Sequence, residues 1–291
     1  MLAQKDLFGN TVVEDVLLRD KFIEPPFSVL DAKNSNWVRR KKEWNKLGIK
    51  SEIGRDVKTF TGGKFKNNKG KSDRFDNKAT SIFDPALCEI LYHWFCVNGK
   101  EILDPFAGGS VRGIVANYLG YKYSGIDIRK EQIESNIEQA INILDTENQP
   151  KWYVGDSNVV LDKIDQKFDF IFSCPPYGNL ETYSDLNGDI SNMPYNIFME
   201  AYESIIAKSC SLLNNNSYAC FVVGEIRDKK GNYMGFVSDT INAFKKCGMN
   251  FYNEAIYLQQ LGTASMRVEN NMKAQKLVKV HQNVLIFKKN D

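Results

Sequence analysis

The sequence of 291 residues is poor in the side chains that build metal clusters and disulfide frameworks, since it has only six cysteines and two histidines. No two cysteines form a C-x-x-C pair, so we expect no zinc cluster or disulfide scaffold, and reduced thiols fit a cytoplasmic location. A run of about 18 apolar residues is also lacking, so we expect no membrane span. The first residues contain no apolar signal core, so export is not expected. What remains, at 43% hydrophobic and 25% charged residues, excludes a wholly disordered chain.

The formal net charge of +2 hides an uneven distribution. Residues 33–80 contain 15 basic and 5 acidic side chains, so this segment carries +10 and the rest of the chain carries −8. A basic segment beside an acidic body indicates a nucleic-acid partner. The alternative is a solvated segment whose tryptophans only dock it on the core. The candidate contacts, two aromatic rings for stacking and four cations for phosphates, are Trp37, Trp44, Arg39, Arg40, Lys41 and Lys42.

Strand and helix patterns alternate after residue 80, which is typical of a mostly parallel sheet covered on both faces. The predicted strands are 101–103, 122–126, 152–154, 168–173, 218–223, 251–258 and 284–287. The predicted helices are 84–97, 110–119, 131–144, 158–164, 195–213 and 236–246. We therefore expect an α/β fold, a seven-stranded doubly wound Rossmann-like sheet that ends on a β-hairpin-like pair. It would occupy residues 81–291 and follow a basic N-terminal extension, residues 1–80.

A glycine-containing loop follows the first of these strands. Its sequence is Asp104-Pro105-Phe106-Ala107-Gly108-Gly109-Ser110, and adjacent glycines permit close backbone approach to a ligand at a helix N-terminus. The next strand ends in Asp127, where a carboxylate can hold a ribose diol. This is not the dinucleotide pattern G-x-G-x-x-G, and Asp104 would repel a pyrophosphate but suit a cationic amino group. S-adenosylmethionine fits both carboxylates; the alternative is an ordinary strand–turn–helix.

A second loop, Ser173-Cys174-Pro175-Pro176-Tyr177, follows the fourth predicted strand. The two prolines remove two amide hydrogens and fix φ, so the carbonyl of Pro175 is a rigid acceptor without a competing local donor. Such an acceptor suits methylation of an exocyclic base amine, whose lone pair is delocalised into the ring, while Tyr177 stacks on the base. A base in a duplex must be flipped out to reach such a site. The alternative is a rigid Pro-Pro turn.

These motifs together resemble the S-adenosylmethionine-dependent DNA amino-methyltransferases, the N6-adenine and N4-cytosine group. Residues 155–157 and the closing segment 281–288 are similar to that group as well. Residues 26–31 and 44–55 resemble stand-alone DNA methylases of phages and mobile elements, which places the protein in the host cytoplasm if it is phage-encoded. The fold expected from this resemblance is the Rossmann-like methyltransferase sheet.

The resemblance implies roles for individual residues. Asp104, Phe106, Gly108 and Gly109 would hold the methionine half of the cofactor, and a segment near Ser81 its carboxylate. The expected catalytic residues are Ser173, Cys174, Pro175, Pro176 and Tyr177. Asp127 would bind the ribose hydroxyls, Ile128 would lie against the adenine, and Asp156 would contact its amino group. The full expected cofactor set is Ser81, Asp104, Pro105, Phe106, Ala107, Gly108, Gly109, Ser110, Asp127, Ile128, Asp156 and Ser157.

One departure from the group concerns Cys174, because the group carries Asp, Asn or Ser directly before Pro-Pro and a thiol is a weak acceptor. Three hypotheses therefore stand. The first is amino methylation of DNA, with RNA possible; the second is pyrimidine C5 methylation with Cys174 as nucleophile. The third is a non-catalytic nucleic-acid-binding protein with this fold. Arg227 and Arg267 are further candidates for contacts to phosphate or base edges, and the protein is expected to be a monomer or homodimer without a metal.

Overall fold

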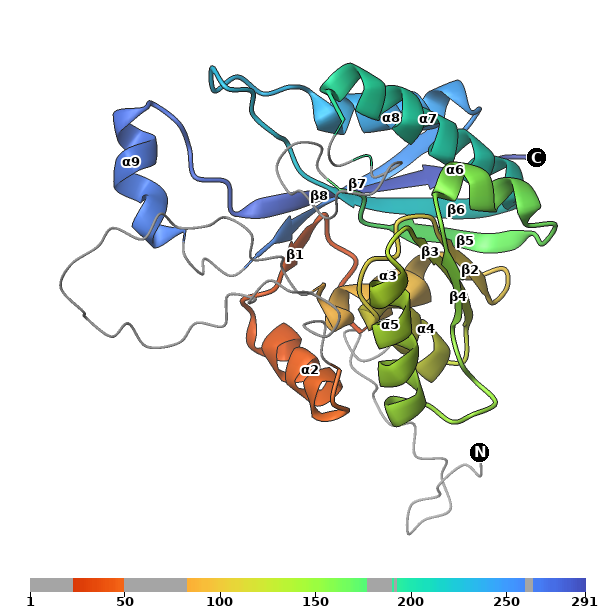
Figure 1. Cartoon of the computed structure of the whole chain (residues 1–291). Coiled ribbons are helices and arrows are strands. Elements are labelled where there is room, and N and C mark those ends of the chain that lie inside the picture. The colour runs from red at the N-terminus through yellow and green to blue at the C-terminus, as the bar shows by residue number, and fades with distance from the viewer. Residues whose placement is uncertain (1–22, 50–82, 177–189, 191–192, 260–263) are drawn as a thin grey trace, which may run out of the picture.

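The computed structural model describes residues 23–49, 83–176, 190, 193–259 and 264–291 (Figure 1). The strands are β1 Val29–Asp31, β2 Glu101–Asp104, β3 Lys122–Asp127, β4 Lys151–Val154, β5 Phe168–Ser173, β6 Leu213–Val223, β7 Asn250–Leu258 and β8 His281–Lys288. The helices are α2 Ser35–Lys46, α3 Pro85–Phe95, α4 Val111–Tyr118, α5 Lys130–Ile143, α6 Ser157–Val160, α7 Tyr195–Leu212, α8 Phe236–Lys246 and α9 Val268–Lys273, with short 3-10 turns at Leu161–Lys163 and Ser265–Arg267.

All of these strands form one sheet in the order β1-β7-β8-β6-β5-β2-β3-β4. Strand β8 is antiparallel to β6 and β7, and the other pairs are parallel. The predicted doubly wound, Rossmann-like sheet with a final antiparallel pair is therefore confirmed. The predicted count of seven is one too few among the described residues, because β1 pairs with the last three residues of β7. Three residues are too few to show an alternating pattern.

Helices cover both faces of the sheet (Figure 1). One apolar cluster joins the sheet to α2, α3 and α4, and a second joins the opposite face to α7 and α8. Strand β6 contributes to both, with Cys220 and Val222 on the first face and Ala219, Phe221 and Val223 on the second. Because both faces are covered, such a strand is a continuous apolar run, which is why it was recognisable in the sequence.

Helix α2 is anchored in the core by its tryptophans. Trp37 and Trp44 are 1% and 6% exposed. The indole of Trp44 donates to Glu89 (2.7 Å) and that of Trp37 to Asp84 (3.3 Å), and the hydroxyl of Tyr257 donates to Asp84 as well (2.8 Å). The expected stacking of these two tryptophans on nucleic acid is therefore wrong, because both rings are buried against α3. The sequence left docking open as the alternative, and docking is what the structure shows.

Two of the four cations expected to contact phosphates form ion pairs within the protein, and the other two are exposed. Arg40 pairs with Glu89, and Lys41 lies 2.9 Å from Asp84, so both stabilise the attachment of α2. Arg39 and Lys42 are exposed. None of the helices that the structure describes has the length and apolar character needed to cross a membrane.

Candidate active site

The two loops singled out in the sequence meet at the centre of the sheet. From β2 the chain passes to β3 and β4 on one side, and from β5 to β6 on the other, so the strand order reverses between β2 and β5. Ligands of open α/β sheets bind beyond the carboxyl ends of the strands at such a reversal. The hydroxyl of Ser173, at the end of β5, donates to Oδ1 of Asp104, at the end of β2, over 2.6 Å. The glycine-containing loop and the Cys-Pro-Pro loop are therefore adjacent.

Asp104 is the centre of a buried hydrogen-bond network. Its Oδ1 accepts from Ser173 and from the backbone N–H of Phe106 (3.1 Å). Its Oδ2 accepts from Nε of Arg112 (2.5 Å) and from the hydroxyl of Tyr123 (2.7 Å). The carboxylate thus joins β2, β3, β5 and α4 through four donors, and the residue is 0% exposed.

Arg112, in the first turn of α4, completes this network and fixes the loop. Its Nη2 donates to the carbonyl oxygens of Phe106 and Ala107, both over 2.7 Å. Its guanidinium also lies over the ring of Phe83, 4.7 Å from the centroid. The planar fork of arginine suits several fixed acceptors at once, so this one side chain sets the path of the loop between β2 and α4.

The titration behaviour of these groups follows from their burial and their charges. Burial alone would lower the pKa of Arg112, but the adjacent charge of Asp104 outweighs it and raises that pKa. Burial, followed by the negative charge of Asp104, raises the pKa of Tyr123 well above its usual value. Arg112 is therefore a cation and Tyr123 a neutral hydrogen-bond donor at neutral pH.

The network corrects the expectations for three residues. Asp104 was expected to face a cationic amino group, but its carboxylate is fully buried and already pairs with Arg112. Ser173 is fully buried and donates to Asp104, and Ser110 is fully buried and donates to Gln139 (3.2 Å). All three are buried residues that hold the loops in place through hydrogen bonds within the protein. The signal that could have shown this is the lone arginine in the otherwise uncharged helix α4.

Asp127 lies at the end of β3, beside the glycine-containing loop. Its Oδ2 accepts from the backbone N–H of Gly108 (3.0 Å), and its Oδ1 accepts from that of Arg129 (2.8 Å). The Asp127 side chain is 13% exposed. Nε of Arg129 lies 3.8 Å from Oδ1 as well, so both carboxylate oxygens already face donors. A carboxylate has about four lone-pair sites, so a ligand hydroxyl would share these oxygens with the donors already present. Ile128, the next residue, is half-buried.

Gly108 keeps the loop open next to Asp127. Its φ is +53°, in the left-handed region, and a Cβ built on it would meet nothing within 4 Å. Phe106, Gly108 and Gly109 are partly exposed, whereas Pro105 and Ala107 are buried. The loop thus offers a ligand its glycines and its phenylalanine.

The turn after β4 is attached to the same loop. Ser157 donates from its hydroxyl to the carbonyl of Pro105 over 2.6 Å and is 7% exposed. Asp156 is half-buried and caps α6 by accepting from the backbone N–H of Asn158 (2.8 Å). The structure therefore brings the ends of β2, β3, β4 and β5 together, as the sequence predicted.

The described part of the Cys-Pro-Pro loop ends at Pro176. Cys174 and Pro176 are half-buried, and Pro175 is buried. Cys174 packs against the apolar cluster on the α2 and α3 side of the sheet. The expected roles of Tyr177 and Ser81 lie outside the described residues.

The two remaining candidate arginines lie on segments at the same edge of the sheet. Arg227 follows β6; it donates to the carbonyl of Gly231 (2.6 Å) and stacks on Tyr233, 3.9 Å from the ring centroid. Arg267 is exposed, directly before α9. No group of three or more His, Cys, Asp or Glu side chains in the described part of the chain is arranged to hold a metal ion.

Comparisons with known proteins give structural matches only. No family model matches the sequence, and no curated protein matches it. TrmN from Thermus thermophilus is 15% identical over 75% of this chain with a TM-score of 0.49, and this chain spans about half of it (53%). Magnesium protoporphyrin IX methyltransferase (ChlM) from Synechocystis PCC 6803, solved with bound SAM, is 14% identical over 71% of this chain and 79% of its own, with a TM-score of 0.46. TehB from Haemophilus influenzae is 16% identical over 67% of this chain and 59% of its own, with a TM-score of 0.41. Likeness at this level does not identify a substrate or a reaction.

Proposed function

We propose that this protein transfers a methyl group from S-adenosylmethionine to the exocyclic amino group of adenine (N6) or cytosine (N4) in DNA. The observation that carries the proposal is the hydrogen bond from Ser173 to Asp104, because it holds the two loops side by side where the strand order reverses. Methyl transfer is an in-line displacement that depends mainly on positioning, so a donor loop and an acceptor loop must be fixed relative to each other.

The residues at this edge fit the proposed cofactor. Asp127 presents a partly exposed carboxylate suited to a ribose diol, and the left-handed Gly108 leaves open space beside it. Asp156, on the neighbouring turn, would accept from the adenine amino group, and Ile128 would lie against the ring. When bound, the cofactor supplies an electrophilic methyl group carried by a sulfonium. Asp104 would act through Arg112 and the loop backbone.

The acceptor side consists of the Cys-Pro-Pro loop. The carbonyl of Pro175 would accept a hydrogen bond from the target amine and draw its nitrogen towards tetrahedral geometry. With the amine held there, its nitrogen lone pair would be directed at the methyl group that the cofactor supplies, and the proton lost from the methylated amine would pass to solvent. Cys174 stands where an oxygen acceptor is usual in the group that the sequence resembles, so its weak acceptor capacity leaves more of this role to Pro175.

The test is nucleoside mass spectrometry after incubation of the protein with deuterated-methyl S-adenosylmethionine and a mixture of DNA and RNA. We expect labelled N6-methyladenine or N4-methylcytosine from the DNA, with the label lost in Asp127→Ala and retained in part in Asp127→Asn. The amide of Asn can still accept from the N–H of Gly108, so this pair separates the loop contact from the negative charge.

Cys174→Ser distinguishes the amine route from a route through carbon. A serine hydroxyl is a better acceptor than a thiol, so the amine route predicts equal or higher activity in this variant. Cys247→Ser, on a half-buried cysteine after α8, serves as the matched control. A labelled C5-methylpyrimidine that disappears in Cys174→Ser would contradict the proposal, as would label confined to RNA. No label with any nucleic acid, together with no binding of S-adenosylmethionine, would leave a non-catalytic binding protein.

A further inference from the structure

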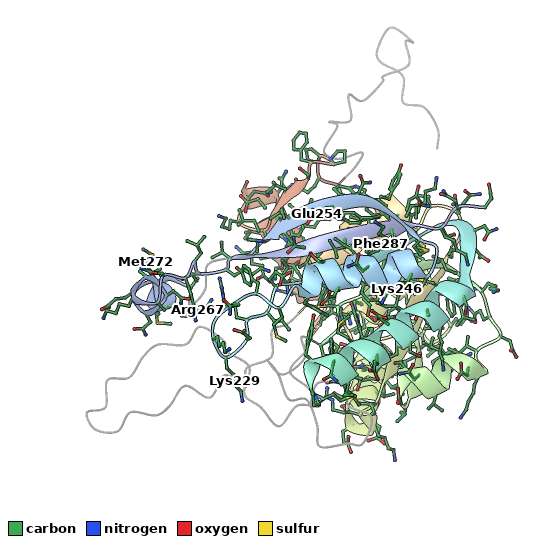
Figure 2. The ribbon with its side chains drawn as sticks, turned by 90° about the horizontal axis from the view of Figure 1, so that it is seen from above. Lys229, Lys246, Glu254, Arg267, Met272 and Phe287 are labelled. Atoms are coloured by element: carbon green, nitrogen blue, oxygen red, sulfur yellow. The ribbon has the colours of Figure 1, made fainter. Side chains whose placement is uncertain are left out.

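Two neighbouring segments project from the sheet beside the candidate active site. They are residues 227–233, after β6, and residues 264–280, which contain α9; we call them together the basic arm. Figure 1 shows that α9 lies away from the sheet, and Figure 2, from above, shows Arg267 and Met272 at α9 and Lys229 on the segment after β6. Because β7 is antiparallel to β8 and β8 is antiparallel to β6, the connection from β7 to β8 lies at the carboxyl edge of the parallel strands.

The basic arm combines positive charge with exposed apolar side chains. It holds seven basic and two acidic residues, a net charge of +5. Both acids are already engaged, since Glu269 pairs with Lys273 (2.6 Å) and Asp228 accepts from the backbone N–H of Asn232 (2.8 Å). The basic residues are Arg227, Lys229, Lys230, Arg267, Lys273, Lys276 and Lys279, and the exposed apolar residues are Met266 (50%), Val268 (48%), Met272 (62%) and Leu277 (80%).

The two segments of the basic arm form one surface. A Cβ on Gly231 would lie 2.3 Å from Nζ of Lys276, so the two segments touch there. Burial lowers the pKa of Lys279, the charge of Glu225 opposes that effect, and the smaller effect of Arg227 lowers the pKa further. Arg227 of the first segment and Lys279 of the second are therefore near each other, so the two segments bring their cations together on one side of the sheet.

The position of the arm suits a nucleic acid whose base enters the candidate site. Neighbouring strands lie about 4.8 Å apart, and the arm leaves the sheet at β6, β7 and β8, which are one to three strands from β5, so its bases lie roughly 5 to 15 Å from the Cys-Pro-Pro loop. Successive phosphates of one DNA strand rise about 3.4 Å along the helix axis, so a span of about 10 Å along that axis covers about three base-pair steps. Long apolar side chains among cations are also what proteins insert between base steps when they open a duplex.

We propose that the basic arm binds duplex DNA beside the target base, with its cations on phosphates and with Leu277 and Met272 against the bases. This inference rests on the proposed function, since it names the surface that would hold the substrate of that reaction. It also explains why apolar side chains in α9 and in the residues next to it are exposed, since the bases of the DNA would cover them.

The test is the anisotropy of a fluorescein-labelled DNA duplex titrated with the full chain at several salt concentrations, without S-adenosylmethionine. We expect the triple variant Lys229→Gln/Arg267→Gln/Lys276→Gln to weaken binding and to reduce the slope of log K against log salt by about 0.9 for each lost phosphate contact. The matched control is Lys122→Gln/Lys167→Gln/Lys246→Gln, which removes the same charge at the opposite edge of the sheet, where β3 and β5 begin and α8 ends. Its slope should equal that of the wild type.

A second variant separates the apolar contact from the charges. Met272→Ala/Leu277→Ala should weaken binding about tenfold with an unchanged salt slope, because burial of such a side chain contributes without releasing counterions. Equal effects of the arm and control triples would overturn the proposal, as would arm-dependent binding of an RNA hairpin or an acidic protein in place of the duplex. Since binding is measured without turnover, arm-dependent DNA binding with no methyl transfer would refute the proposed function and leave this inference standing.

Discussion

Replacement of Arg112 by methionine tests whether the buried network at the reversal point holds the site together. The change removes the only cation among the donors to Asp104 in the described structure, together with both hydrogen bonds to the carbonyls of Phe106 and Ala107. Loss of one partner of a buried ion pair costs about 3–5 kcal/mol, because the other charge stays buried without compensation. For a chain of 291 residues this corresponds to a fall in Tm of roughly 5–8 °C.

The cause can be isolated with a double-mutant cycle followed by thermal and urea unfolding. Asp104→Asn in the Arg112→Met background removes the uncompensated charge, so the double variant should be more stable than Arg112→Met alone, with a coupling energy of about 2–3 kcal/mol. Lys122→Met is the control: its pair with Glu101 spans 3.1 Å but the lysine side chain is 71% exposed, so we expect less than about 1 kcal/mol. Single effects that add to within about 0.5 kcal/mol would refute the reasoning.

The same network makes a separate prediction for cofactor binding. Arg112→Lys keeps the positive charge but loses the planar fork that reaches both carbonyls. It should therefore retain more stability than Arg112→Met, while S-adenosylmethionine measured by calorimetry binds more weakly than to the wild type. Unchanged affinity in Arg112→Lys would show that the loop does not need the fork.

Three further predictions concern the surrounding core. Gly125→Ala places a Cβ 2.5 Å from Cε1 of Tyr123, so we expect a loss of about 1–3 kcal/mol in urea unfolding. Trp44→Phe removes the 2.7 Å hydrogen bond to Glu89 and should cost about 1–3 kcal/mol by the same measurement, since the carboxylate stays buried. Burial raises the pKa of Cys96 to about 12 from an ordinary value of 9.0, so the neutral thiol's contribution to stability is fully present below pH 9 and is lost as the pH rises to 12. The free energy of unfolding of the wild type, measured in urea, should therefore fall across that window by on the order of 4 kcal/mol more than that of Cys96→Ala.

The sequence was sufficient for the parts of the fold that depend on local patterns. Strand β5 and helix α7 lie where alternation and helical spacing placed them, and the two loops lie side by side because the carboxyl ends of parallel strands share an edge. Strand β6 begins at Leu213, whereas the sequence predicted its start at residue 218. The prediction missed the start because residues 214–217 are polar and carry no strand pattern.

The sequence was insufficient where a role depends on a partner far along the chain. Asp104 reads as a ligand for a cation until Arg112 and Tyr123 are placed around it. The sequence predicts that Trp37 and Trp44 stack on nucleic acid, because they lie among cations. Their acceptors, Asp84 and Glu89, come about 45 residues later, and no local pattern indicates that these residues will meet. The composition of a segment is known from the sequence alone, whereas the burial of its side chains depends on the distant residues that pack against it.

The short strand β1 has a consequence for how the chain behaves when shortened. It covers only Ile256–Leu258 of the nine-residue strand β7, and Phe251 and Tyr252 on the uncovered part are already 39% and 52% exposed. Without residues 23–49 the whole of β7 would become an open edge able to pair with the same edge of another molecule. A shortened version that begins at residue 81 should therefore self-associate or precipitate, although the candidate active site lies three or more strands away.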